Sequence, residues 1–165
     1  IDYARSIGRD VLVEAERGYI GSGSSNKESN PEGAGVKTKP EEAKKFVEMT
    51  GIDMLAPSVG SIHGLIKSGK PHIDEELVVE IKKEVGIPLV LHGGSGLRDE
   101  DFMNGIKAGI SIIHINTEIR VAFTEALHKF ITEHPEETTP YKFLSPVVEK
   151  MKGYLAEKIR LFANP

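Results

Sequence analysis

Residues 89–96 read LVLHGGSG, a short apolar run that ends in a histidine and continues into a glycine-rich turn. Pro88 before the run and the glycines after it are typical of the boundaries of a buried strand. His92 can bind a metal ion or transfer a proton, and the backbone N–H groups of the turn can approach an anion. The helix predicted from Asp99 adds further N–H donors nearby. The stretch therefore predicts a strand that ends in residues able to bind a metal ion, transfer a proton or bind an anion.

Three other apolar runs end in a similar way. Residues 52–64 read IDMLAPSVGSIHG, residues 109–118 read GISIIHINTE, and residues 11–18 read VLVEAERG. In each of them, histidine, glutamate, asparagine or threonine stands at or just after the end of the run. Parallel barrels place their active sites at the carboxyl ends of the strands. The repeated pattern therefore predicts a functional site at one edge of a parallel sheet.

Strands and helices are expected to alternate along the chain. The expected strands lie near residues 10–16, 53–58, 87–91 and 110–115. The expected helices cover residues 40–50, 74–85, 99–108, 117–133 and 146–162, and a helix end at residues 1–8 precedes them. This alternation predicts an α/β fold with a parallel sheet. The long stretch 18–39 is a candidate lid, because long loops without regular structure are often functional.

Composition excludes several classes of function. The chain has 165 residues, no cysteine and a formal net charge of -4, so disulfide and thiolate chemistry are excluded and no nucleic-acid partner is expected. No apolar run reaches the roughly 20 residues of a membrane span, so we expect no membrane partner and a cytoplasmic location. Because the chain begins at Ile1, we also expect a fragment or a processed product.

Four motifs together carry a resemblance to a known family. They are VEAERG at residues 13–18, GSIHG at 60–64, LVLHGGSG at 89–96 and NTE at 116–118. In this order they resemble the class II, zinc-dependent fructose-bisphosphate and tagatose-bisphosphate aldolases. The resemblance implies a (β/α)8 TIM barrel of which this chain supplies the second half, strands five to eight. Residues 1–135 would form these strands with their helices, and residues 136–165 a C-terminal helical extension of the same domain.

The resemblance also implies roles for individual residues. His63 and His92 match two of the three zinc-binding histidines, and Glu16 matches a carboxylate that can act as an alternative ligand. The residues implied to bind the substrate or its phosphate are Gly64, Gly93, Gly94, Ser95, His114, Asn116 and Thr117. Nearby backbone oxygens are implied to bind a monovalent cation, Na⁺ or K⁺. The family's third zinc-binding histidine and its acid/base aspartate follow strand three, which lies outside this chain.

Two positions depart from the family's pattern. His114 stands where the family usually has asparagine. Residues 21–28 read GSGSSNKE and carry no acid at the positions where the family has one. Glu28, farther along the same loop, is therefore the candidate catalytic carboxylate within the chain.

The expected activity is metal-dependent aldol cleavage and condensation of a phosphorylated ketose. Fructose- or tagatose-1,6-bisphosphate would give dihydroxyacetone phosphate and glyceraldehyde 3-phosphate, in a homo-oligomeric enzyme. Zinc would stabilise the enediolate as a Lewis acid. Two histidines alone bind zinc weakly, so residues 1–165 by themselves are expected to be inactive, and to self-associate through unpaired strand edges. The alternative is a non-catalytic phosphosugar-binding fragment or scaffold; a strand ending in Asp-His upstream of Ile1 would favour the enzyme.

Each candidate residue also has a purely structural interpretation. A histidine at a strand end often makes ordinary hydrogen bonds, and Glu16 could pair with a lysine or an arginine inside the fold. Asn116 and Thr117 could cap the helix that follows them. His114 lies between two isoleucines and could either point into a barrel or pack as a structural residue.

Overall fold

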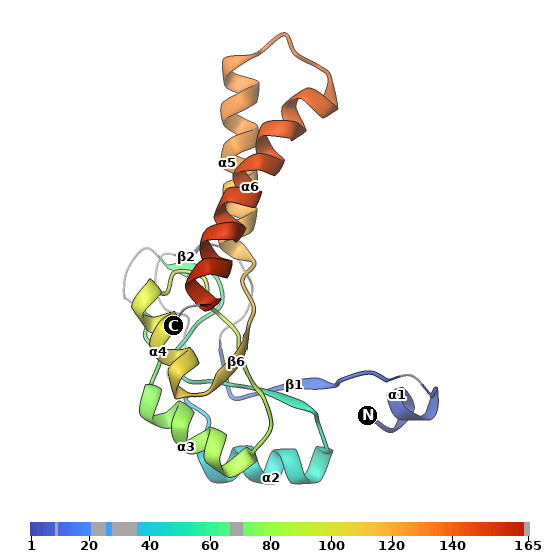
Figure 1. Cartoon of the computed structure of the whole chain (residues 1–165), viewed down its shortest axis with the longest axis vertical. Helices are drawn as coiled ribbons and strands as arrows, with labels where there is room; N and C mark the ends of the chain where they lie inside the picture. The colour runs from blue at the N-terminus through green and yellow to red at the C-terminus, as the bar shows by residue number, and fades with distance from the viewer. Residues whose placement is uncertain (9, 21–25, 28–35, 67–70, 164–165) are drawn as a thin grey trace.

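The computed structural model describes residues 1–8, 10–20, 26–27, 36–66 and 71–163. Helices and strands alternate along most of this length (Figure 1). In chain order the elements are α1 (Asp2–Ser6), β1 (Glu14–Arg17), β2 (Asn26–Lys27), α2 (Pro40–Thr50), β3 (Met54–Pro57), β4 (Leu65–Ile66), α3 (Glu75–Val85), β5 (Leu89–Leu91), α4 (Asp99–Ala108), β6 (Ile110–Ile113), α5 (Thr117–Glu133) and α6 (Pro140–Ala163).

Four strands form one parallel sheet in the order β1-β3-β5-β6. Glu14 of β1 is in register with Met54 of β3, and Leu55 of β3 with Leu89 of β5. An irregularity between Leu89 and Val90 shifts the pairing of β5 with β6 by one residue. The parallel arrangement and the four strand–helix alternations confirm the α/β fold with a parallel sheet that was expected from the sequence. In the sheet as described, β1 and β6 are the edge strands.

The core lies where helices α2, α3 and α4 pack on the sheet. Its fully buried side chains include Leu55, Leu89 and Leu91 from the strands, and Ile81 and Phe102 from the helices. Phe102 also meets Phe162 of α6, with ring centroids 5.2 Å apart. Burial of such side chains contributes roughly 1.5–3 kcal/mol each. The core therefore fixes the strands, and with them the positions of the residues that follow their ends.

The strands are shorter than the sequence predicts. Strand β1 begins at Glu14, and the expected strand residues before it include Val11 and Leu12, which are exposed. The neighbouring strand begins only at Met54, so the paired ladder starts at Glu14, although the carbonyl oxygen of Val13 still accepts a hydrogen bond from the N–H of Asp53 at 2.9 Å. The other three predictions, near 53–58, 87–91 and 110–115, each extend past the observed strand by one or two residues at one or both ends.

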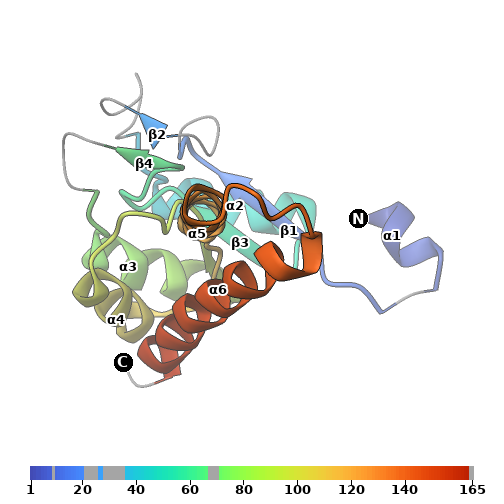
Figure 2. The ribbon, with the colours of Figure 1, turned by 90° about the horizontal axis from the view of Figure 1, so that it is seen from above.

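The last helix begins six residues earlier than predicted. Helix α6 starts at Pro140 and contains Pro146, which the sequence placed at the helix start. Proline is favoured in the first turn of a helix, where its missing N–H needs no partner. A second proline farther along removes one backbone hydrogen bond, and the rest of the helix continues past it. Helices α5 and α6 run side by side as a hairpin that projects from the sheet (Figures 1 and 2).

The sequence did not predict a small second sheet. Strands β2 and β4 pair in parallel, and β2 lies within the stretch 18–39 that was a candidate lid. Residues 21–25 and 28–35 of that stretch, including Glu28, lie outside the described residues, so the lid prediction is untested. Across the described ranges, no helix combines the length and the apolar content that a membrane span requires.

Candidate functional site

Two carboxylates of strand β1 contribute to the site at the ends of the strands. Side chains two residues apart on a strand lie on the same face, so Glu14 and Glu16 point to the same side of the sheet. Glu14 lies 2.7 Å from His92, and Glu16 lies 2.7 Å from the same ring and 3.6 Å from His63. The alternation Glu-Ala-Glu could have signalled Glu14 as well as Glu16, but the sequence analysis assigned a role only to Glu16.

The histidines come from the segments that follow the other three strands. His63 follows β3, His92 follows β5 directly, and His114 follows β6 directly. The ring of His92 lies between the other two, with centroids 5.7 Å from His63 and 5.0 Å from His114. The three side chains are part-exposed: 30% for His63, 18% for His92 and 53% for His114. The fold therefore brings together the two histidines implied as metal ligands.

The donor set of this cluster fits a transition metal ion. Glu16, His63 and His92 offer one ligand atom each within 4.8 Å of one another, and so do Glu14, His92 and His114. Imidazole nitrogens and carboxylate oxygens are the ligands of catalytic zinc sites. Both ring nitrogens of His92 face a carboxylate oxygen at 2.7 Å. A neutral imidazole can donate from only one nitrogen, so the second contact requires a cation or a further proton.

A cavity of about 250 Å³ opens beside the histidines. It is lined by His63, Gly64, His92, Gly93, Gly94, Ser95, His114, Asn116 and Thr117. These are the two predicted histidine ligands and all seven residues that were expected to bind the substrate or its phosphate. The structure therefore places residues from three separate segments of the sequence around one small space.

Gly93 lets two chain segments approach closely at this cavity. Its φ of +67° is in the left-handed region, and a Cβ atom there would lie 2.5 Å from the carbonyl carbon of Ile62. Only glycine fits such a position without displacing the backbone. Nearby, the hydroxyl of Ser61 donates to the carbonyl oxygen of His92 at 2.7 Å. The His63 and His92 segments are thus fixed against each other.

The glycine-rich turn is held from the other side by helices α5 and α6. The N–H of Gly96 donates to Glu118 of α5 at 2.9 Å, and the hydroxyl of Tyr154 on α6 donates to the same carboxylate. Burial and this hydrogen bond raise the pKa of Tyr154, so the phenol stays protonated as a donor. Neither Glu118 nor Tyr154 was predicted as a site residue, because no local motif links residues so far apart.

The helix after the turn is anchored by a buried carboxylate. Asp101 is only 1% exposed and accepts hydrogen bonds from the guanidinium of Arg98 at 3.0 and 3.1 Å. The ring Nδ1 of His72 lies 2.7 Å from the same carboxylate. Burial by itself would raise the pKa of Asp101, but the hydrogen bonds from Arg98 and His72 outweigh burial and lower it. This cluster fixes the start of α4 directly behind the turn.

Two structural interpretations from the sequence, for Glu16 and for Asn116, find no support among the described residues. Among the described residues, the ion pairs of Glu16 are with histidines and none is with a lysine or an arginine. Asn116 occupies the cap position of α5, but its side chain makes no capping hydrogen bond. Instead, Asn116 lines the cavity together with Thr117, which is buried.

Fold and site define an α/β protein whose strand ends combine a metal-capable cluster with a glycine-rich turn that lines the same cavity. Residues 1–164 match the model of the family described as "Fructose-bisphosphate aldolase class-II". The chain belongs to this family.

Two solved structures of aldolases are similar to this chain. The YdjI aldolase from Escherichia coli K12 is 33% identical, with a TM-score of 0.76; the match covers 98% of this chain and 52% of that one. The fructose-bisphosphate aldolase from Campylobacter jejuni is 23% identical, with a TM-score of 0.70, over 93% of this chain and 52% of that one, and shows likeness of fold. The chain spans about half the length of each.

Proposed function

We propose that the protein containing these residues catalyses the reversible aldol cleavage of a phosphorylated ketose. The substrates are fructose- or tagatose-1,6-bisphosphate, and the products are dihydroxyacetone phosphate and glyceraldehyde 3-phosphate. In this proposal the chain is the second half of a (β/α)8 barrel, strands five to eight, in a cytoplasmic homo-oligomer. Family membership over residues 1–164 supports an aldolase, and the half-barrel is supported by the parallel β1-β3-β5-β6 sheet and by the match to about half of an aldolase chain.

One observation carries the proposal. The metal-capable cluster and the glycine-rich turn border the same 250 Å³ cavity. A ketose bisphosphate presents a carbonyl and hydroxyl groups close to a phosphate, so it needs a metal and an anion site side by side. Either feature alone would be compatible with many functions, and their adjacency favours this one.

The metal is Zn²⁺, held by His63 and His92 with Glu16 as an alternative ligand. When bound, it would act as a Lewis acid that stabilises negative charge on the substrate oxygens. The third histidine implied by the resemblance lies outside residues 1–165. Glu14 would accept a hydrogen bond from the Nε2–H of His92 and so hold the orientation of the ring, as carboxylates commonly do behind histidine ligands.

The remaining residues bind and orient the sugar. The backbone N–H groups of Gly64, Gly93, Gly94 and Ser95 would bind the phosphate, since a turn at a helix start is a favourable anion site. His114, Asn116 and Thr117 line the other part of the cavity and would contact substrate hydroxyls. A monovalent cation, Na⁺ or K⁺, would bind backbone oxygens beside the phosphate.

Cleavage breaks the C3–C4 bond and leaves its electron pair on C3 of the enediolate. The proton of the C4 hydroxyl passes to a carboxylate that the resemblance places outside this chain. Reprotonation of C3 needs a second acid, for which Glu28 is the candidate within these residues. Both steps need a phosphate that is held in a fixed position, which is what the Gly93 contact and the Glu118 support provide.

The test is release of dihydroxyacetone phosphate from each of the two bisphosphates by the protein that contains these residues. We expect release from at least one sugar, its loss after treatment with a chelator, and its recovery on addition of Zn²⁺. His63→Asn should abolish release, whereas His128→Asn, the same change on an exposed position of α5, should leave it unchanged.

Release that a chelator does not affect would contradict the proposal. Binding of dihydroxyacetone phosphate without cleavage of either sugar would support the non-catalytic phosphosugar-binding alternative instead.

A further inference from the structure

The ring of His92 is shared by two sets of potential ligands. Its Nδ1 faces Glu16 at 2.7 Å, on the side where His63 lies, and its Nε2 faces Glu14 at 2.7 Å. On the Nε2 side, Nε2 of His114 lies 3.8 Å from the other oxygen of Glu14. The cluster therefore has a second side, formed by β1, β5 and β6, that the proposed zinc site does not use.

The geometry of this second side is that of a ligand set. Glu14, His92 and His114 offer three ligand atoms within 4.8 Å of one another. The rings of His92 and His114 are stacked, with an interplanar angle of 26° and centroids 5.0 Å apart. The side chain of His114 is 53% exposed, so its ring is accessible to an ion from solvent.

The charges of the cluster also favour a bound cation. Glu14 and Glu16 lie on adjacent same-face positions of one strand, and their ion pairs among the described residues are with histidines only. Two carboxylates this close stabilise positive charge between them. A cation bound at one nitrogen of His92 would supply this positive charge. The N–H at the other nitrogen would then donate a hydrogen bond to the opposite carboxylate.

We propose that Glu14, His92 and His114 form a second position for a divalent transition metal ion, on the opposite side of the His92 ring from the position at Glu16 and His63. Two imidazoles and one carboxylate suit Zn²⁺, Co²⁺ or Ni²⁺, whereas Ca²⁺ and Mg²⁺ prefer oxygen ligands. A neutral His92 presents one free nitrogen at a time. One ion is therefore bound per chain, at one of the two positions.

The experiment is a Co²⁺ titration of the protein that contains these residues, followed by calorimetry and by the visible absorption of the bound ion. Three variants separate the two positions. Glu16→Gln with His63→Asn leaves only the new position intact, and Glu14→Gln with His114→Asn leaves only the proposed zinc site intact. The variant with all four changes leaves neither position intact. Removal of groups that merely support a metal ligand costs 10–100-fold in affinity. Loss of direct ligands should therefore cost at least about 100-fold.

We expect the Glu16→Gln, His63→Asn variant to bind one Co²⁺ and to lose at least about 100-fold in affinity when Glu14→Gln and His114→Asn are added. Equal affinity with and without those two added changes would overturn the second position. Failure of the Glu14→Gln, His114→Asn variant to bind would instead count against the proposed zinc site. His128→Asn is the control for nonspecific binding, and circular dichroism verifies that each variant is folded.

Discussion

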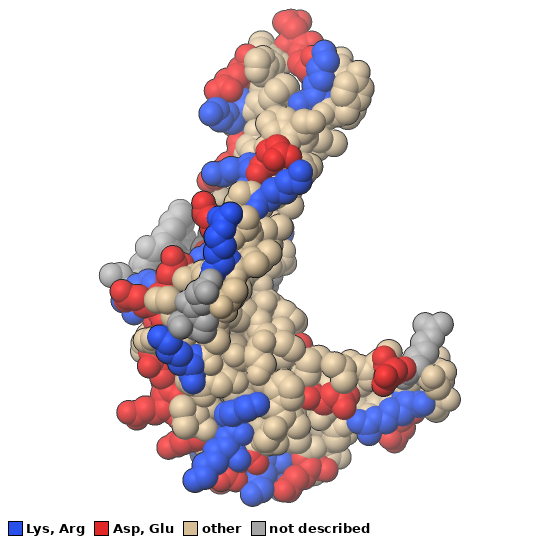
Figure 3. Space-filling model, in the orientation of Figure 1, with Lys and Arg blue, Asp and Glu red and all other residues tan. Residues whose placement is uncertain are grey.

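The strand-end site and the α5–α6 hairpin use the same kinds of residues in opposite ways. At the strand ends, glutamates and histidines from four segments contact one another at 2.7–3.8 Å. Along the hairpin, positively charged lysines and negatively charged glutamates are mixed on an exposed surface (Figure 3). Charged groups that converge from separate strands can bind a ligand, whereas those spread along a helix mainly keep it solvated.

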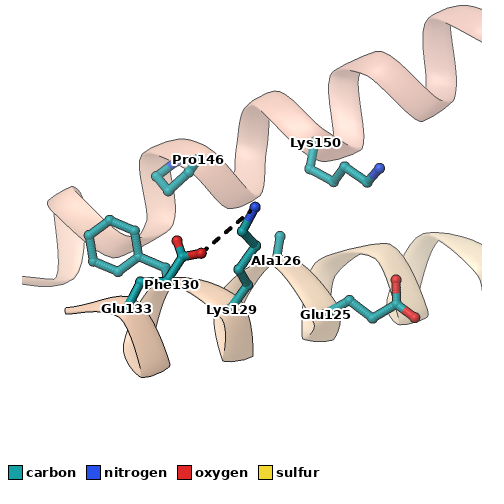
Figure 4. A pocket seen from close by; sticks show the side chains of 7 residues that line it. All are labelled: Glu125, Ala126, Lys129, Phe130, Glu133, Pro146 and Lys150. Atoms are coloured by element: carbon teal, nitrogen blue, oxygen red, sulfur yellow. Dashed lines mark ion pairs between the residues drawn. The ribbon is translucent and has the colours of Figure 1, made fainter. Parts of the chain in front are cut away.

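The hairpin also has a hollow, but of a different character. It measures about 460 Å³ and lies between α5 and α6, where Phe130 and Pro146 face each other across a gap (Figure 4). Its nearest ion pair, Lys129 with Glu133, joins neighbouring turns of a single helix at 3.9 Å. A hollow formed by two helices with mixed, exposed charges offers no fixed set of donors. Size alone therefore does not identify the functional cavity.

The largest expected difference in stability comes from a glycine-to-alanine change in each region, the strand-end site and the hairpin. Gly93→Ala should destabilise the protein by about 3 kcal/mol, because a left-handed alanine is strained and its Cβ would overlap Ile62. Gly153→Ala on α6 should stabilise it by up to about 1 kcal/mol, since nothing lies within 4 Å and alanine favours a helix. Urea unfolding of both variants measures the difference, and equal effects would remove the distinction between the regions.

A smaller effect is expected from the anchor of α4. Asp101→Asn should cost about 2 kcal/mol at neutral pH, because charged hydrogen bonds from Arg98 are lost at a buried carboxylate. The folded-state pKa of Asp101 lies below its unfolded value. The stabilisation is therefore complete above the unfolded value and is lost as the pH falls through the folded one. The difference in unfolding free energy between the two proteins should be constant above the unfolded value and shrink as the pH falls below it; a difference that does not shrink would contradict this account.

Tyr154→Phe tests the link between the hairpin and the site. Loss of the hydroxyl that donates to Glu118 should cost about 1 kcal/mol of stability. Because Glu118 also holds the N–H of Gly96, binding of dihydroxyacetone phosphate should weaken as well. Tyr141→Phe, an exposed tyrosine at the far end of α6, is the matched control. Unchanged binding in the Tyr154 variant would show that the hairpin does not support the turn.

The smallest effect is expected on the hairpin surface. Lys129→Ala removes an ion pair whose side chains are 74% and 56% exposed, so stability should change by less than about 0.5 kcal/mol. A thermal unfolding measurement is sufficient. A loss above 1 kcal/mol would show that the hairpin carries more of the fold's stability than its exposure indicates.

Local patterns in the sequence determined much of this protein. Capping residues, which act within a few positions, determine the helix ends at Gly51 and Gly86 and the Asp74 cap of α3. Short apolar runs between the helices determine the parallel α/β class. The same logic placed His63, His92 and the glycine-rich turn at strand ends. Errors occurred where local signals compete: Pro146 could begin a helix or lie within one, and residues 10–13 resemble a strand although the ladder with β3 starts only at Glu14.

Only the tertiary structure decided how these strand ends meet. The contacts of His92 join residues 76 and 78 positions apart, and the Glu118–Tyr154 hydrogen bond joins two helices. Sheet order and helix packing set such distances, and neither is written in any short motif. The sequence therefore determined which side chains stand at the strand ends. The fold decided that one histidine lies between two carboxylates, with a further histidine on each side.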